Sequence, residues 1–276
     1  MPTNTRPRIA VVGPTAVGKT ALAVELCQRF NGEVINADSR QVYKQMDIGT
    51  AKATPAELAL VPHHLLDLLL PSESFGLGAF LPLAQAAADD IISRGKLPLA
   101  AGGTGQYVWA LLEGQSVPAV PPDPEFRAAL ETEAVADGGG QLLHDRLRQI
   151  DPVRADALDA RNVRRVIRAL EIFHITNQKP SELGQKEPVT GDYLVLGLTM
   201  ERKAIYQRID DRVDAMMAAG FLAEVERLAE AGYPMGEGSL DSPGYRELGQ
   251  HLTGELSLDE AVDRTKTQTH RLARRQ

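Results

Sequence analysis

The stretch from Arg8 to Phe30 reads RIAVVGPTAVGKTALAVELCQRF. Its first five residues form a short apolar, partly β-branched run, and residues 20–30 carry apolar side chains at helical spacing. Between the two stands GPTAVGKT (13–20), which matches the pattern G-x-x-x-x-G-K-[ST] in full. A strand, a glycine loop and a helix in this order are the context in which that pattern binds phosphate groups.

The loop supplies three kinds of phosphate ligand. Gly13 and Gly18 allow backbone conformations that point successive N–H groups inward, and the following helix adds its dipole. Lys19 supplies a positive charge, and the Thr20 hydroxyl can bind Mg2+, the cofactor we expect. The spacing disfavours an ordinary glycine turn. We therefore predict a diphosphate- or nucleotide-binding site made of Gly13, Pro14, Thr15, Ala16, Val17, Gly18, Lys19 and Thr20.

Further strands and helices alternate after the loop. Residues 33–37 read as a second strand that delivers Asp38, and residues 97–101 as a third that ends in Gly102-Gly103-Thr104, with a helix near 79–93 between them. Such alternation predicts an α/β fold, a P-loop NTPase-like parallel sheet flanked by helices. Ligands of such sheets bind at the carboxyl ends of the strands.

The character of the sequence changes at Gly114. The proline-rich stretch SVPAVPPDP and then polar, helical sequence run to about Glu187, after which residues 193–199 read as a strand again. Helices near 202–219 and 222–231 follow, each stopped by a glycine. We therefore predict a P-loop catalytic core of residues 1–113 and 190–276, and an inserted helical subdomain of residues 114–189.

Composition narrows the class of protein. The 276 residues are 43% hydrophobic and can bury a large core, and the single cysteine, Cys27, excludes an intrachain disulfide and reads as a packed core thiol. We expect a cytoplasmic protein without a membrane partner, because no run approaches the roughly 20 apolar residues of a membrane span and residues 1–8 lack an apolar signal region. The net charge of -7 argues weakly against nucleic acid, but two stretches, 161–171 and 264–275, are basic.

Polar side chains follow the second predicted strand. The segment DSRQVY (38–43) combines a carboxylate, a hydroxyl, an amide and a phenol. These groups are suited to holding and deprotonating a polar acceptor. Asp38 is also the one decent candidate for the magnesium-binding Asp of a nucleotide hydrolase, so the residues alone leave the reaction open.

Six segments in order carry a family resemblance. They are GPTAVGKT, DSRQVYKQMDIGTAK (38–52), PHHLLDL (62–68), GGTGQY (102–107), RRVIRALEIF (164–173) and GYRE (244–247). Together they resemble the tRNA dimethylallyltransferases, also called tRNA isopentenyltransferases, over essentially the whole chain. The resemblance implies transfer of the dimethylallyl group from dimethylallyl diphosphate to N6 of adenosine 37, beside the anticodon of tRNA. The loop would then hold a diphosphate leaving group.

The resemblance also implies roles for three further side chains. Asp38 would be the catalytic base, Thr104 would donate its hydroxyl to the bridging oxygen of the leaving group, and Arg212 would bind diphosphate. Each has an ordinary alternative: Asp38 as a helix cap or magnesium ligand, Thr104 as a turn residue. Arg208 and Arg212, four apart on one helix face, could instead form a solvated salt-bridge face.

The implied partner is the tRNA anticodon stem-loop, with its adenine splayed out toward Asp38. By resemblance, Asp38, Ser39, Arg40 and Gln41 contact tRNA near the base, and Arg127, Arg164, Arg165 and Arg168 contact it from in or beside the insertion. A merely solvated basic helix is the alternative for these arginines. Tyr107 and Trp109 could stack on bases, but they read as core residues. We expect a monomer.

The sequence departs from the family pattern in several places. Gln106 replaces a common leucine, Ala53 a common proline, and LDSP (240–243) an ordinary lead into GYRE. Members usually continue beyond the position of Gln276 with an aromatic-containing stretch, so the resemblance implies a shortened or divergent end. These departures bear on tRNA affinity more than on chemistry. His63-His64 lacks partners at zinc-ligand spacing, which favours packing and hydrogen bonding.

Three other functions compete. A P-loop small-metabolite kinase would bind ATP and use Asp38 as base. A free-adenylate isopentenyltransferase would not need the insertion at 114–189, and an RNA-binding module without catalysis would not need Lys19, Asp38 and Thr104.

Overall fold

The chain divides into two compact units. A computed structural model describes residues 8–115, 118, 120–183 and 193–276. Unit 1 comprises Met1–Leu112 with Val189–Gln276, and unit 2 comprises Glu113–Pro188. Residues 116, 117 and 119 of the proline-rich stretch, and residues 184–189 of the predicted insertion, lie outside the described residues, as do residues 1–7 of the amino-terminal stretch.

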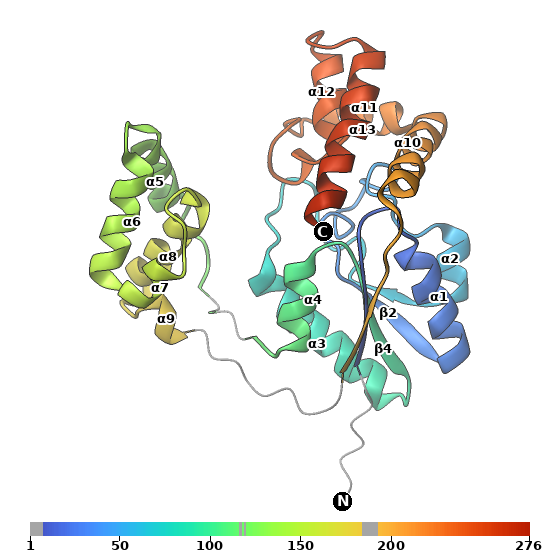
Figure 1. The fold of residues 1–276 in the computed structure, drawn as a ribbon, viewed down its shortest axis with the longest axis horizontal. Helices are drawn as coiled ribbons and strands as arrows, with labels where there is room; N and C mark the ends of the chain where they lie inside the picture. The colour runs from blue at the N-terminus through green and yellow to red at the C-terminus, as the bar shows by residue number, and fades with distance from the viewer. Residues whose placement is uncertain (1–7, 116–117, 119, 184–192) are drawn as a thin grey trace, which may run out of the picture. The chain divides into compact units, whose positions relative to one another are not determined.

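Unit 1 is built on a parallel sheet of five strands among the described residues (Figure 1). The strands are β1 (Arg8–Val12), β2 (Gly32–Asn36), β3 (His63–His64), β4 (Leu97–Ala101) and β5 (Tyr193–Gly197). Their order is β3-β2-β4-β1-β5, so β1 lies between β4 and β5, with Ile9 opposite both Leu99 and Leu194. The predicted α/β fold class, a parallel sheet flanked by helices, is confirmed.

Successive residues of each strand point to opposite faces of the sheet, so both faces carry apolar side chains, and helices cover both. One face packs on α3 (Leu77–Ser93) and α4 (Gly105–Leu112) and contributes Ala10, Ile35 and Ala100 to their core. The other packs on α1 (Lys19–Phe30) and contributes Val11, Val34 and Leu99. Cys27 is buried in this second core, and burial raises the pKa of its thiol to about 12, so it is the packed core thiol that the sequence predicts.

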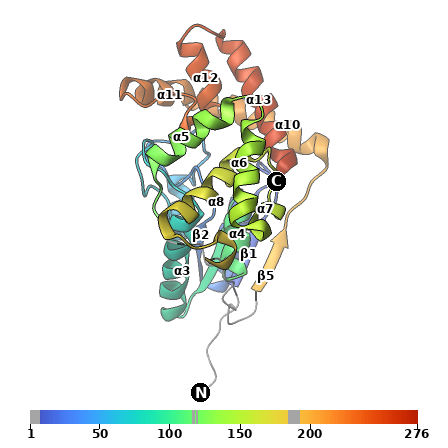
Figure 2. The same ribbon diagram turned by 90° about the vertical axis from the view of Figure 1, so that its left-hand side faces the viewer.

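The other helices of unit 1 include α2 (Pro55–Leu60), α10 (Arg202–Ala218), α11 (Phe221–Glu230), α12 (Tyr245–Leu252) and α13 (Leu258–Arg275). Helices α10 to α13 gather beyond the carboxyl ends of the strands (Figures 1 and 2). The ring of His270 stacks on Tyr206 at 4.1 Å and its Nε2 lies 2.8 Å from Asp210 Oδ1, which fastens α13 to α10. The helical wall beside the site is therefore a connected layer.

Unit 2 is helical throughout its described residues. It contains α5 (Pro124–Val135), α6 (Gly139–Ile150), α7 (Pro152–Asp156), α8 (Val163–Thr176) and α9 (Pro180–Leu183). Its core includes Leu143, Leu147, Val166, Ile167 and Leu170. A carboxylate, Glu171, is also fully buried there and is bound by arginines. Unit 2 thus has a hydrophobic core of its own.

The structure corrects several predictions. β3 was not predicted, because the two histidines carry no apolar pattern, and β5 ends at Gly197 rather than at residue 199. Tyr107 is buried as predicted, but Trp109 is 46% exposed and the prediction that it belongs to the core is wrong. Helix α4 turns Tyr107 and Val108 toward the sheet, and Trp109 points away from it.

Among the described residues, no helix is long and apolar enough to cross a membrane.

Candidate active site

The phosphate loop connects β1 to α1 in a conformation that its glycines allow. Gly13 has φ 146° and Gly18 φ 106°, and a Cβ at Gly13 would lie 2.6 Å from the carbonyl oxygen of Leu198. The N-cap residue of α1 is Gly18, which has no side chain that could accept hydrogen bonds from the first N–H groups of the helix. Lys19 Nζ donates to the carbonyl oxygens of Gly13 at 2.9 Å and Pro14 at 3.0 Å. The loop therefore has the geometry of an anion site.

Three cations converge on the loop. Arg212 Nη1 lies 3.3 Å from Thr15 Oγ1, and Arg208 and Arg212 line the same cavity as Lys19. Burial lowers the pKa of Lys19 to about 8, Asp38 opposes this shift and Arg212 adds to it. Burial likewise lowers the pKa of Arg212. Neither arginine forms an ion pair with a described residue, so a salt-bridge face does not explain them.

Asp38 follows β2 in a turn that uses one of its carboxylate oxygens. Oδ1 accepts a hydrogen bond from the Arg40 N–H at 2.9 Å, and the Asp38 N–H donates to Asn36 Oδ1 at 3.1 Å. Oδ2 has no hydrogen-bond partner among the described residues, and it lies 3.3 Å from where a Cβ on Gly103 would stand. The carboxylate therefore keeps one oxygen for a ligand.

Thr104 lies beside Asp38 because β2 and β4 come very close at their ends. A Cβ on Gly102 would lie 2.2 Å from Ala37, so only glycine allows this approach. Thr104 Oγ1 accepts a hydrogen bond from the Ser39 N–H at 3.0 Å. Because a hydroxyl both accepts and donates, the Thr104 proton remains for a further acceptor.

Two cavities meet at these residues. The larger, about 890 Å³, is lined by the phosphate loop, by residues 47, 48 and 50–55 and by α10. The smaller, about 450 Å³, is lined by Ser39, Arg40, Thr104 and one face of α13. Asp38, Lys19, Thr15 and Arg212 line both. Asp38 thus lies where the two cavities meet, beside the cations Lys19 and Arg212.

Gln276 also contacts the phosphate loop, a contact that no sequence pattern predicts. Its Oε1 accepts a hydrogen bond from the Thr15 N–H at 2.7 Å, and its Nε2 donates to the carbonyl oxygen of Gly103 at 3.0 Å. The carboxamide oxygen occupies a position on the loop that suits a phosphate oxygen.

The predicted tRNA residues beside Asp38 are partly engaged within unit 1. Arg40 Nη1 donates to the carbonyl oxygens of Gly238 and Ser239, at 3.0 and 3.1 Å. Gln41 Nε2 donates to those of Thr50 and Ala51, at 3.1 and 3.2 Å. Gln41 therefore offers only its carbonyl oxygen to a ligand.

The four predicted arginines of unit 2 fall into two pairs. Arg127 binds the buried Glu171 through two hydrogen bonds, of 2.7 and 2.8 Å, and Arg168 binds the same carboxylate. Arg164 and Arg165 are exposed and have no ion pair with a described residue. The first pair holds unit 2 together, and the second is free to meet an anion.

The two adjacent histidines form hydrogen bonds, as predicted. His64 Nε2 lies 2.7 Å from Glu33 Oε2, and His63 Nδ1 lies 2.8 Å from the Val61 carbonyl oxygen. Hydrogen bonds from Arg94, Lys96 and His64 hold the pKa of Glu33 far below its usual range, although burial opposes them. No three His, Cys, Asp or Glu side chains in the described part of the chain form a metal-holding group.

The fold and the site define a class: α/β proteins in which a phosphate-binding loop follows the first strand of a parallel sheet. Within that class, the family described as IPP transferase matches residues 41–276, and the family described as isopentenyl transferase matches residues 8–67. The chain belongs to the IPP transferase family, which confirms the resemblance seen in the sequence.

Individual relatives are similar over nearly the whole chain. A tRNA dimethylallyltransferase of Roseiflexus sp. (strain RS-1) is 51% identical over 270 residues, which cover 98% of this chain and 88% of the relative. The crystal structure of the full-length tRNA isopentenylpyrophosphate transferase from Bacillus halodurans matches with a TM-score of 0.70 and 43% identity, covering 98% of this chain and 85% of that one. A eukaryotic dimethylallyltransferase acting on tRNA matches with a TM-score of 0.84 and 34% identity, covering 98% and 69%. These names favour prenyl transfer to tRNA over the kinase alternative.

Proposed function

We propose that this chain transfers the dimethylallyl group of dimethylallyl diphosphate to N6 of adenosine 37 in the anticodon stem-loop of tRNA. The observation that carries the proposal is the position of Asp38, which lines both cavities and keeps Oδ2 free of hydrogen-bond partners among the described residues. The larger cavity is lined by Gly18, Thr20 and Arg208 at the phosphate loop and suits a diphosphate, and the smaller opens beside Ser39 and Arg40 and suits an incoming base.

The proposed reaction exchanges one bond for another. The bond between C1 and oxygen of the donor breaks, and its electron pair leaves with the diphosphate. The N6 lone pair forms the new bond to C1, and N6 loses a proton to the Asp38 carboxylate. The base is needed because the adenine ring delocalises this lone pair and makes N6 a weak nucleophile.

The leaving group needs stabilisation as its charge grows. The loop N–H groups, Lys19 and Arg212 supply positive potential, and the free hydroxyl proton of Thr104 can be donated to the bridging oxygen. Thr20 lines the larger cavity together with Lys19 and Arg212, and its hydroxyl is a hard oxygen donor, so it fits Mg2+ together with diphosphate oxygens. Bound there, Mg2+ would add charge stabilisation to the departing diphosphate.

The same proposal assigns tRNA contacts. Ser39 and Arg40 line the smaller cavity and Gln41 lines the larger one. Arg164 and Arg165 offer exposed charges to phosphates. Arg127 and Arg168 contribute through their hold on Glu171, and each side chain remains partly exposed. We place the reaction in the cytoplasm and assign it to a monomer.

The deciding experiment combines the protein with Mg2+, dimethylallyl diphosphate and unmodified tRNA, followed by digestion and mass analysis of the nucleosides. The expected product is prenylated adenosine at position 37. A matched reaction with ATP in place of the donor tests the kinase alternative, since a kinase would consume ATP without tRNA. ATP turnover without prenylated adenosine would overturn the proposal.

A further inference from the structure

The face of α10 that lines the larger cavity changes chemistry along its length. Arg208 and Arg212 lie on it near the phosphate loop, and Ala215, Met216 and Ala219 follow on the same side. From Arg212 to Ala219 the helix advances by roughly 10 Å. Along that distance the wall passes from cationic to apolar, as the head and tail of a prenyl diphosphate do.

The wall that faces this helix comes from the segment between β2 and α2. Within it, residues 47–52 form a turn, with the Lys52 N–H bonded to the Asp47 carbonyl oxygen at 3.0 Å. Ile48, Thr50 and Ala51 line the same cavity as Met216. The space for the donor tail is thus bounded by this turn and by α10.

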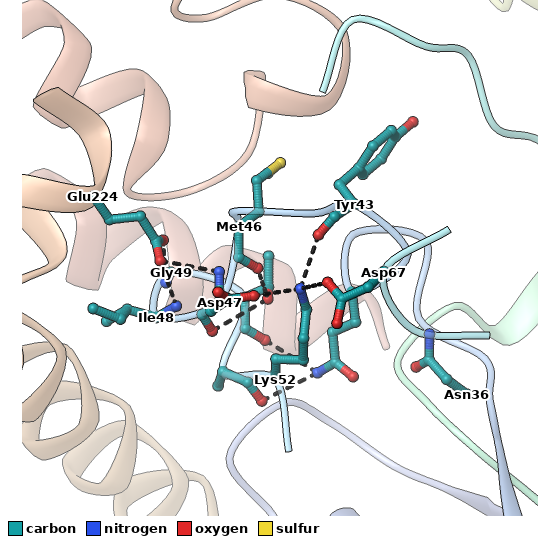
Figure 3. Close-up of polar contacts among 12 residues, drawn as sticks. Asn36, Tyr43, Met46, Asp47, Ile48, Gly49, Lys52, Asp67 and Glu224 are labelled. Atoms are coloured by element: carbon teal, nitrogen blue, oxygen red, sulfur yellow. Dashed lines mark hydrogen bonds and ion pairs between the residues drawn. The ribbon is translucent and has the colours of Figure 1, made fainter. Parts of the chain in front are cut away.

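One buried carboxylate holds the turn. Glu224, in the first turn of α11, is 1% exposed. Its Oε2 accepts hydrogen bonds from the N–H groups of Asp47 at 3.0 Å and Ile48 at 2.8 Å, and its Oε1 from that of Gly49 at 3.1 Å. Figure 3 shows the carboxylate facing these three consecutive residues. Since α11 follows α10 directly, Glu224 links the turn to the opposite wall of the cavity.

A fourth donor and two aromatic rings complete this arrangement. The Tyr245 hydroxyl donates to Glu224 Oε1 at 2.6 Å, and burial together with Glu224 raises the pKa of Tyr245, which keeps the phenol protonated. A Cβ on Gly49 would lie 2.2 Å from the Phe221 ring and 2.6 Å from the Tyr245 ring. The turn therefore rests directly on α11 and α12, and its position depends on them.

The opposite side of the turn is tied separately. Lys52 Nζ donates to the carbonyl oxygen of Tyr43 at 2.8 Å and to the carboxylates of Asp47 at 2.5 Å and Asp67 at 2.6 Å (Figure 3). None of these groups belongs to α10 or α11. Lys52 fixes the shape of the segment, and Glu224 fixes its distance from α10.

We propose that Glu224 is a positioning residue for the prenyl donor: it holds residues 47–49 so that Ile48 and Met216 enclose the dimethylallyl tail. The inference rests on the proposed function, because it takes the donor to be a prenyl diphosphate. The diphosphate end contacts the loop, Lys19 and Arg212, none of which Glu224 touches. Loss of Glu224 therefore weakens binding of the tail and leaves binding of the diphosphate nearly unchanged.

Calorimetry without tRNA tests this separation, because donor binding is then measured without transfer. Glu224→Gln keeps the volume but replaces an acceptor oxygen with an NH2 group that opposes the surrounding N–H donors. We expect the Kd for dimethylallyl diphosphate to rise about tenfold and that for inorganic diphosphate to change less than about twofold. Glu226→Gln is the matched control, because Glu226 lies on the same helix, is exposed and has no hydrogen bond or ion pair with a described residue.

Equal changes in both constants, or none in either, in a folded Glu224→Gln protein would overturn the proposal. If that variant does not fold, Tyr245→Phe decides, because it removes one of the four donors and keeps the ring. We expect the ratio of the two constants to change about threefold in Tyr245→Phe, and an unchanged ratio overturns the proposal. A wild-type protein that binds both ligands equally would instead overturn the donor assignment on which the proposal rests.

Discussion

Donor binding should weaken as the pH rises through the pKa of Lys19. Burial lowers this pKa from 10.5 to about 8, so the ammonium loses its proton within a range that the protein can be assayed in. A bound diphosphate favours the charged form and moves the pKa back up. Between the two pKa values, binding takes up one proton, and affinity falls as pH rises.

The size of the effect follows from the free-state pKa. At about pH 7 nearly all Lys19 side chains are charged, and at about pH 9 roughly one in ten is, so the Kd should rise about tenfold, or ~1.4 kcal/mol. Asp38 opposes the lowering of this pKa, so Asp38→Asn should move the midpoint of the profile to lower pH. Lys19→Arg should give a flat profile, because a guanidinium stays charged throughout.

Calorimetry with dimethylallyl diphosphate in two buffers of different ionisation enthalpy measures both affinity and proton uptake. Dimethylallyl diphosphate is preferable to inorganic diphosphate, which itself titrates in this range. We expect uptake of about one proton at about pH 9 in the wild-type protein and none in Lys19→Arg. A wild-type affinity that is constant across this range would refute the assignment of Lys19 as the titrating phosphate ligand.

Three further predictions separate chemistry, stability and tRNA binding. Asp38→Ala should leave donor binding largely intact and slow prenyl transfer by ~10²- to 10⁴-fold, and near-normal single-turnover transfer would remove Asp38 as the base. Glu33→Gln should cost about 3 kcal/mol in urea unfolding at neutral pH, because it breaks a buried ion-pair cluster. Since the folded pKa of Glu33 is lowered, that difference should be present above its ordinary value of 4.5 and shrink as pH falls below it. Arg127→Ala should lower the melting temperature, whereas Arg164→Ala should weaken tRNA binding and reduce its salt dependence by about one charge without changing stability. The reverse pattern would exchange the two roles.

Local sequence patterns predicted four of the five strands in the described sheet and the phosphate loop after the first. The apolar runs at 8–12 and 97–101 end in glycines, and the structure places β1 and β4 at those residues. Because the strands are parallel, their carboxyl ends meet, and this brings Asp38 and Thr104 to one edge. β3 was not predicted, because its two polar residues adopt strand geometry only by pairing with β2.

Contacts between distant residues could not be read from the sequence. Gln276 reaches Thr15, and Glu224 reaches residues 47–49, through the tertiary fold alone. One signal for Glu224 was present: it lies on the same face of α11 as Phe221, Val225 and Leu228, which are all buried. A carboxylate on an apolar face must find donors or destabilise the protein.

The roles of the arginines of unit 2 could not be predicted from the sequence either. Arg127 and Arg164 look equivalent in the sequence, and only the burial of Glu171 distinguishes a structural arginine from a free one. The prediction that Trp109 is a core residue failed for a related reason, since an apolar residue in an apolar helix can still face away from the sheet.

The strand order has a consequence for synthesis on the ribosome. β1 is made first, yet its neighbour β5 begins only at Tyr193, after all of unit 2. Unit 2 is one continuous stretch of sequence, so it can fold before unit 1 is complete. Until β5 is made, the edge of β1 that pairs with it stays unpaired. The helix that carries Arg208 and Arg212 emerges later still. A nascent chain therefore displays the phosphate loop long before it can hold a donor.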